Sequence, residues 1–285
     1  MKAVVTGANG QLGKALLATC PPHVEAVGLT RMELDLVNTP LIADVIASQA
    51  PDLIINAAAY TAVDKAESEA ELAHQINGVA VKALQKAAAE HMAKLVHVST
   101  DFVFDGRKSS PYLPGDATNP QSVYGASKLA GEHAVDGDTL LVRTSWVYGA
   151  AGSNFVNTML RLMASKPALS VVTDQIGTPT YARGLASALW QMAEKRASGI
   201  YHYSDSGAAS WYDFAVAIQE EAVALGVLSG NIPISPIATS EYPTPAARPA
   251  YSVLDKAKTW QLLGAPAPHW RSQLRETLRT LKSHG

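Results

Sequence analysis

Three glycines near the amino terminus constrain the fold of this chain more than any other feature. Residues 3–6 form a largely β-branched run, Gly7, Gly10 and Gly13 follow it, and residues 11–18 have a helical pattern. This order predicts a buried strand, a tight turn and a helix. Glycine lets the turn approach a pyrophosphate closely, and the helix presents free N–H groups and the positive end of its dipole. Because the spacing differs from the common G-x-G-x-x-G, the prediction of dinucleotide binding depends on the elements around the glycines.

Strands and helices alternate through the first half of the chain. Strand-like runs occupy residues 3–6, 24–28, 53–56, 95–99 and 140–143, and helical patterns occupy residues 11–19, 40–50, 69–91 and 124–135. The alternation predicts an α/β fold with a Rossmann-like doubly wound parallel sheet, whose ligand crevice lies at the carboxyl ends of the strands. We expect residues 1–150 to form an NAD(P)-binding domain, to which later segments can return.

The regular alternation of strands and helices ends after residue 148. Helices are expected over residues 154–164, 182–195, 210–225 and 270–281, and strands over residues 170–173 and 200–203. We expect residues 151–285 to form mainly a smaller C-terminal α/β region that binds the substrate.

The composition limits the kinds of binding partner and the cellular compartment that we expect for this protein. The net charge of −2 gives no indication of nucleic-acid binding, and no apolar span is long enough to suggest a membrane helix. Cys20 is the only cysteine, so an intramolecular disulfide is impossible, and the eight histidines show no metal-binding spacing. We expect a cytoplasmic protein with no metal, no nucleic-acid partner and no membrane partner.

Tyr124 and Lys128 stand four residues apart in a predicted helix, so they project from the same face. An ammonium beside a phenol stabilises the phenolate and brings its pKa closer to useful acid–base chemistry. Thr100, at the end of a predicted strand, is placed to hydrogen-bond the same reacting oxygen. A Tyr–Lys pair alone is usually a solvated surface, but the glycine loop and Thr100 favour catalysis at a carbonyl or an alcohol.

Longer segments carry a resemblance to a family. They are Ser99-Thr-Asp-Phe-Val-Phe-Asp-Gly106, Asn56-Ala-Ala-Ala-Tyr-Thr-Ala-Val-Asp-Lys-Ala-Glu67, Arg143-Thr-Ser-Trp-Val-Tyr148, Asp174-Gln-Ile-Gly-Thr-Pro-Thr180 and Tyr242-Pro-Thr-Pro-Ala-Ala-Arg-Pro249. The chain resembles the extended short-chain dehydrogenases/reductases and, within them, the dTDP-4-dehydrorhamnose reductases. The last two segments lie outside the cofactor half, in the part of the chain that determines substrate choice.

The resemblance implies reduction of the 4-keto group of dTDP-4-dehydro-β-L-rhamnose to dTDP-L-rhamnose, in rhamnose and cell-surface polysaccharide biosynthesis. Hydride would pass from the nicotinamide of NADPH, or of NADH, to C4 of the sugar. Tyr124 is expected to protonate the developing alkoxide, and Thr100 to hydrogen-bond the carbonyl oxygen. Lys128 is expected to lower the pKa of Tyr124 and to hold the nicotinamide ribose.

Arg31 follows the second predicted strand and favours NADPH, because arginine accommodates a 2′-phosphate; Thr30 can add a hydrogen bond. The expected cofactor contacts are Gly7, Asn9, Gly10, Gln11, Leu12, Thr30, Arg31, Asp35, Leu36, Ala57, Ala58, Ala59, Tyr60, Tyr124 and Lys128. The expected sugar-nucleotide contacts are Thr61, Asp101, Phe102, Trp146, Asn154, Phe155, Gln175, Thr178 and Arg248. Arg248 suits the nucleotide or its diphosphate. Asp64 and Glu67 are interpreted as the solvated start of a helix.

This chain differs from the family pattern at a few positions, and these differences help to choose between the alternative functions. Phe102 stands where the family usually has tyrosine, which puts a substrate contact in doubt but not the proton donor. A dehydratase needs a glutamate at that position, so dehydration is disfavoured. A 4-epimerase, another NDP-sugar reductase or a regulatory subunit without catalysis remain open. A homodimer is possible, but a magnesium-bridged one is not expected, because Ala15 and Arg183 replace the carboxylates.

Overall fold

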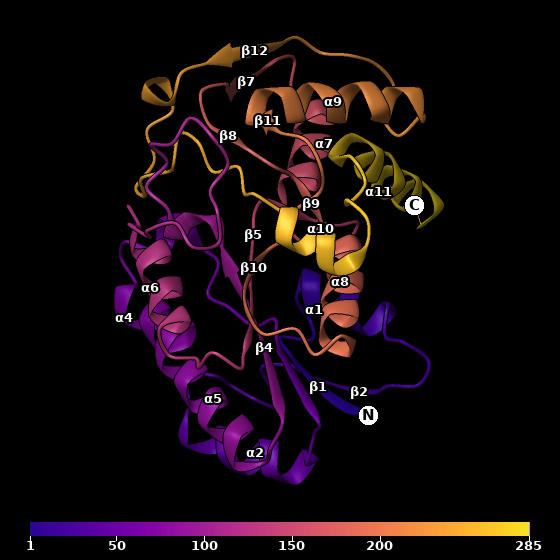
Figure 1. Cartoon of the computed structure of the whole chain (residues 1–285). Helices are drawn as coiled ribbons and strands as arrows, with labels where there is room; N and C mark the ends of the chain where they lie inside the picture. Colours follow the sequence, from indigo (N-terminus) through magenta and orange to yellow (C-terminus); the bar gives the residue numbers. More distant parts are fainter. Residues whose placement is uncertain (285) are drawn as a thin grey trace.

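The computed structural model describes residues 1–284. Within this range six parallel strands form the main sheet in the order β2-β1-β3-β4-β5-β10 (Figure 1). Their bounds are β1 Lys2–Thr6, β2 Glu25–Leu29, β3 Leu53–Asn56, β4 Lys94–Thr100, β5 Leu140–Thr144 and β10 Gly199–His202. The predicted Rossmann-like parallel sheet is therefore confirmed. The strand expected over residues 200–203 belongs to this sheet, and its assignment to the smaller region was wrong.

Alternate strand residues face opposite helical layers, as the period of a β-strand requires. Ala3 and Val5 pack on the side of α1 (Gln11–Ala18) and α8 (Ala182–Glu194), whereas Val4 packs on the side of α2 (Pro40–Gln49) and α5 (Ala80–Glu90). Figure 1 shows the two helical layers on either side of the sheet. Each fully buried valine, leucine or isoleucine of these layers stabilises the fold by roughly 1.5–3 kcal/mol.

The helix expected over residues 69–91 is divided into three parts. They are α4 (Ala70–His74), a π-helical segment η1 (Gln75–Val79) and α5. The wider turn contains Asn77, whose amide accepts a hydrogen bond from Tyr60 N at 2.9 Å and donates to Ser127 Oγ at 2.9 Å. Asn77 thus links the chain after β3 to α6 (Val123–Glu132), the helix that carries Tyr124 and Lys128.

The smaller region lies beyond one end of the sheet (Figure 1). Its core is formed by α7 (Phe155–Ser165), α9 (Trp211–Ala224) and α11 (Trp270–His284), with Phe214, Ile218 and Leu274 fully buried. Beside them, β7 (Leu169–Val172) pairs in parallel with β12 (Ile234–Ile237). The remaining elements are short: α3 Val63–Ala66, η2 Asp101–Val103, β6 Val147–Tyr148, β8 Ile176–Gly177, β9 Thr180–Tyr181, β11 Ala209–Ser210, η3 Thr239–Glu241 and α10 Ala257–Leu263. Across the described residues, no helix combines the length and apolar character needed to cross a membrane.

Candidate active site

The glycine loop is shaped so that backbone, rather than side chains, faces a ligand. Gly7 has a φ of +65°, and a Cβ placed there would lie 2.7 Å from the Cα of Ala58. A Cβ on Gly13 would lie 2.2 Å from the Gly7 carbonyl oxygen, so α1 packs directly on the turn. Gly10 is the N-cap of α1 and has no side chain to cap its first N–H groups. These groups are available to an anion such as a pyrophosphate.

A cavity of about 600 Å³ opens from this loop along the carboxyl ends of the strands. Every predicted cofactor contact except Thr30 lines it, as does Thr61, which was expected to bind the sugar. Its lining also contains residues that were not predicted, namely Leu34, Ala62, Ile76, Val98, Ser99, Thr144 and Val147. A cradle of bare backbone at one end and the Tyr–Lys pair at the other fits a dinucleotide cofactor.

Arg31 and Thr30 lie at the edge of this cavity after β2. The Arg31 side chain is 77% exposed, and its Nε donates to Asp35 Oδ2 at 3.3 Å. Such a surface ion pair is weak, so the guanidinium can exchange Asp35 for a phosphate. The Thr30 hydroxyl and backbone N–H both donate to the Glu33 carboxylate. Thr30 therefore stabilises its own turn here, whereas Arg31 is free to contact a ligand.

Close packing brings Thr100, Tyr124 and Lys128 together. A Cβ on Gly125 would lie 2.3 Å from the Phe102 carbonyl oxygen, so α6 approaches the end of β4 without an intervening side chain. Tyr124 is 9% exposed and Lys128 is 2% exposed, and both line the cavity. The Thr100 hydroxyl lies within hydrogen-bonding reach of the Tyr124 phenol, which links these two members of the predicted trio.

The pKa of Tyr124 moves in the direction opposite to the expectation. Burial raises it to about 12, and the nearby Asp101 adds to the rise while the Thr100 hydroxyl opposes it. The expected lowering by Lys128 is not among the causes of this shift, and removal of the phenolate from water dominates it. Burial also lowers the pKa of Lys128 to about 8, against the opposing charge of Glu132. At neutral pH the phenol therefore holds its proton and the lysine keeps most of its charge.

The hydrogen bonds around the trio define its resting state. Lys128 Nζ donates to the Val98 carbonyl oxygen at 2.7 Å. The Thr100 hydroxyl donates to Asp101 Oδ1 at 3.0 Å and accepts from the Phe102 N–H at 3.2 Å. Burial raises the pKa of Asp101 to about 6. The Phe102 ring meets the Tyr124 ring edge-on with centroids 5.5 Å apart, so it supports the proton donor directly.

A second cavity, of about 450 Å³, lies in the smaller region. Three predicted substrate contacts line it, Phe155, Gln175 and Arg248. Its unpredicted lining includes Trp211, on which Trp146 stacks with ring centroids 3.5 Å apart. A flat aromatic wall next to polar side chains suits a planar base.

Arg248 is held by Asp64 at the start of α3. Its guanidinium donates to Asp64 Oδ1 at 3.0 Å and to Oδ2 at 2.7 Å, and it also contacts the Thr244 hydroxyl. Asp64 is in the first turn of α3 with its side chain 42% exposed, as interpreted, but it also pairs with Arg248. Glu67 is likewise exposed, and its carboxylate accepts from Val123 N at 2.9 Å.

Two other predicted substrate contacts have structural partners. Asn154 caps α7 through the Asn157 N–H, and its amide donates to Gln11 Oε1 at 2.9 Å. It therefore joins the smaller region to the glycine loop. Thr178 is fully buried, and its hydroxyl donates to the Gly207 carbonyl oxygen at 2.9 Å. Its side chain thus supports the loop under Trp146 instead of facing either cavity.

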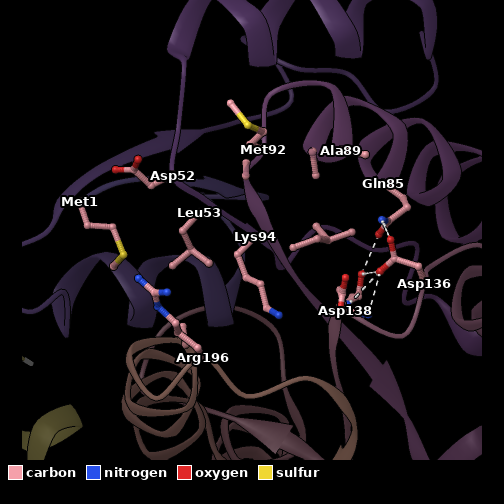
Figure 2. A pocket seen from close by; sticks show the side chains of 15 residues that line it. Met1, Asp52, Leu53, Gln85, Ala89, Met92, Lys94, Asp136, Asp138 and Arg196 are labelled. Carbon is pink, nitrogen blue, oxygen red and sulfur yellow. Dashed lines mark hydrogen bonds between the residues drawn. The ribbon is translucent and has the colours of Figure 1, made fainter.

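A larger cavity of about 740 Å³ lies at the opposite, amino end of the sheet strands. Figure 2 shows Met1, Asp52, Lys94 and Arg196 around it. Neither Tyr124 nor Lys128 lines this cavity. Ligands of doubly wound sheets bind at the carboxyl ends, so the 600 Å³ cavity is the candidate active site. Among residues 1–284, no cluster of histidine, cysteine or acidic side chains is arranged to hold a metal ion.

Comparisons with known proteins agree with this site. The family model described as the RmlD substrate binding domain matches residues 1–283. The dTDP-4-dehydrorhamnose reductase of Aggregatibacter actinomycetemcomitans is 44% identical over 286 residues, which cover 96% of this chain and 97% of that protein. The reductase of the same name from Burkholderia thailandensis is 43% identical, covering 99% of this chain and all of its own.

Solved structures give the same result. A dTDP-4-dehydrorhamnose reductase from Clostridium acetobutylicum superposes with a TM-score of 0.92 at 38% identity, covering 99% of this chain and 100% of its own. That of Bacillus anthracis, solved in complex with NADP, has a TM-score of 0.91 at 36% identity, covering 98% and 99%. A UDP-glucose 4-epimerase from Thermus thermophilus, 18% identical with a TM-score of 0.81, shares the fold.

Proposed function

This chain belongs to the RmlD substrate-binding-domain family, and we propose that it is an NADPH-dependent dTDP-4-dehydrorhamnose reductase. It reduces the 4-keto group of dTDP-4-dehydro-β-L-rhamnose to give dTDP-L-rhamnose for polysaccharide biosynthesis. The observation that carries the proposal is that Tyr124 and Lys128 line a cavity that also contains the glycine loop, with the Thr100 hydroxyl within reach of the Tyr124 phenol. Relatives of this name span nearly the whole chain, which supports the same substrate.

The chain's own residues supply proton delivery and orientation. NADPH, when bound, supplies the hydride that reduces C4 of the sugar. Tyr124 donates its proton to the 4-oxygen as the general acid, and its raised pKa keeps that proton available at neutral pH. Thr100 turns its hydroxyl from Asp101 to the same oxygen and fixes its position. Lys128 holds the nicotinamide ribose and stabilises the phenolate that remains after the proton has moved.

The second cavity supports the nucleotide part of the substrate. Trp211, backed by Trp146, and Phe155 offer aromatic surface to the base, and Gln175 offers a hydrogen-bonding amide. Arg248 binds the diphosphate after exchanging Asp64 for it, because a guanidinium pairs with phosphate oxygens through two parallel hydrogen bonds. Asp101, Phe102 and Thr61 then lie on the sugar's side.

Arg31 supports NADPH as the preferred cofactor, with NADH as a weaker substitute. The free thiol of Cys20 agrees with a reducing cytoplasm. A homodimer without a bridging metal remains a prediction, and light scattering of the purified chain measures it.

Three alternatives are less well supported. Phe102 occupies the position at which a dehydratase needs a glutamate base. The epimerase resemblance is below 20% identity and concerns the fold alone. A regulatory subunit does not need the catalytic trio, which this chain retains, with Thr100 within reach of Tyr124 and with Tyr124 and Lys128 lining one cavity.

The test is a coupled assay in which the 4-keto substrate is generated in place and NADPH oxidation is followed by absorbance. The expected result is substrate-dependent oxidation, with dTDP-L-rhamnose identified by NMR as the product. Oxidation that yields a different deoxysugar would change the substrate assignment. No oxidation, together with tight binding to another enzyme of the pathway, would favour the regulatory alternative.

A further inference from the structure

The inner face of α6 carries a third ionisable residue beyond the catalytic pair. Tyr124, Lys128 and Glu132 recur every four residues and so project from one face toward the sheet. The Glu132 side chain is only 4% exposed. A buried carboxylate is costly unless it is paired and hydrogen-bonded, so its position requires specific partners.

The partners of Glu132 come from two neighbouring strands, β4 and β5. Its Oε1 accepts from Ser99 Oγ at 2.5 Å and from Arg143 Nε at 2.9 Å, and its Oε2 accepts from an Arg143 terminal nitrogen at 2.7 Å. Ser99 on β4 and Arg143 on β5 are register partners. The carboxylate therefore connects α6 to β4 and β5. On β4 the contact is made by Ser99, the residue directly before Thr100.

Arg143 extends the same network to the loop between β4 and α6. Its other terminal nitrogen donates to the Pro114 carbonyl oxygen at 3.1 Å, and its guanidinium lies 5.0 Å from the centre of the Phe104 ring. Since this loop joins Thr100 to Tyr124 along the chain, the ion pair restrains both ends of the catalytic trio.

We propose that Glu132 is a positioning residue for the reduction, acting through Lys128. Its carboxylate sets α6 on β4 and β5 one helical turn from Lys128, and so fixes where the Lys128 side chain lies. The inference rests on the proposed function, because only that reaction gives Lys128 its role.

The other ionisable groups around Lys128 determine whether the loss of Glu132 raises or lowers the pKa of Lys128. Tyr124 shares its helix, the charge of Lys128 acts on His97 of β4, and Asp101 acts on Tyr124. Burial and the Lys128 charge hold the pKa of His97 well below its usual value, so His97 is neutral. Asp101 perturbs Tyr124, whereas Glu132 is the group that opposes the lowering of the Lys128 pKa. Without Glu132, burial alone acts on the Lys128 pKa and favours the neutral amine.

Glu132→Gln tests the inference, because glutamine keeps the shape and still accepts from Ser99. We expect kcat at neutral pH to fall by about tenfold or more, with a smaller change in KM. The alkaline limb of the kcat profile should move to lower pH by about one unit, since Lys128 then loses its proton more easily. Glu132→Asp keeps the charge and should leave this limb at the wild-type pH while kcat falls.

Glu221→Gln is the matched control. The Glu221 side chain is 6% exposed and accepts from Arg271 and Arg275 in the smaller region, far from the trio. The Glu221→Gln variant should have a lower melting temperature than the wild type, and the alkaline limb of its kcat profile should stay at the wild-type pH. A Glu132→Gln enzyme with the wild-type limb and kcat would overturn the inference, even if it were less stable. If that variant does not fold, an undiminished kcat in Glu132→Asp overturns it instead. Wild-type turnover is measured first, because its absence would count against the proposed function and not against Glu132.

Discussion

Burial changes the proton affinities of Tyr124 and Lys128 in opposite directions. It raises the tyrosine pKa to about 12 and lowers the lysine pKa to about 8, because the neutral form of each group is the easier one to bury. In a reduction the tyrosine must act as an acid, so a raised pKa keeps its proton until the substrate oxygen gains electrons. The lysine remains largely charged at neutral pH and loses that charge at more alkaline pH.

Arg31 is the residue on which cofactor choice depends. We expect Arg31→Ala to raise the KM for NADPH by about tenfold, the equivalent of one lost charge-assisted hydrogen bond. The KM for NADH should stay nearly unchanged, because NADH has no 2′-phosphate. Initial rates with both cofactors measure the ratio, and an equal effect on the two would show that Arg31 does not contact the phosphate.

At the scale of elements, the junction of turn and helix at Gly13 is the tightest part of the cofactor site. Gly13→Ala places a Cβ 2.2 Å from the Gly7 carbonyl oxygen, so the loop must move. We expect a loss of about 1–3 kcal/mol of stability and much weaker NADPH binding. Gly137→Ala is the control, because its Cβ meets nothing within 4 Å and should change stability by less than about 0.5 kcal/mol. Chemical denaturation and calorimetric titration measure both, and equal behaviour of the two variants would contradict this account of the loop.

Long apolar runs made the main strands predictable from sequence. Residues 53–56 match β3 at both ends, because a parallel strand buried on both faces is a continuous apolar segment. The π-helical turn at Asn77 was not predicted, because a single inserted turn leaves the apolar pattern of the helix nearly unchanged. Two-residue strands such as β6 and β9 were also missed, since they depend on pairing between distant segments.

The candidate site was predictable to a similar extent. Backbone-lined positions such as Gly7 and Ala58 follow from motif spacing and do line the cavity. Trp211 was missed because its stacking on Trp146 is a contact between segments far apart in the chain. Glu132 had a local signal, its four-residue spacing from Lys128, but its pairing with Arg143 required the register of β4 and β5.

At the scale of the whole molecule, specific contacts join the cofactor half to the substrate half. Gln11 meets Asn154 at one point and Asp64 meets Arg248 at another. A third junction is Asp205, fully buried after β10, whose Oδ2 accepts from Tyr181 N at 3.1 Å. The two cavities therefore lie in parts of the fold that these contacts connect. A substitution at one of the contacts is expected to affect both cavities.

Asp205 gives the fold a pH dependence. Burial raises its pKa from 3.8 to about 7, so between these values the folded protein binds a proton that the unfolded chain releases. Its contribution to stability is thus greatest at acidic pH and is lost as pH rises to about 7. Asp205→Asn keeps an acceptor for Tyr181 and removes the titration. We expect its melting temperature, relative to wild type, to increase between about pH 4 and pH 7 and then level off. A difference that is constant over this range would show that Asp205 does not titrate as described.

The most direct test of the central claim is single-turnover kinetics of Tyr124→Phe with NADPH and the 4-keto sugar nucleotide. Phenylalanine keeps the ring against Phe102 and removes only the proton donor. The account predicts a fall in the reduction rate of about 100-fold or more, with the Kd for NADPH unchanged within about twofold. A reduction rate equal to that of the wild type would contradict the assignment of Tyr124 as the general acid.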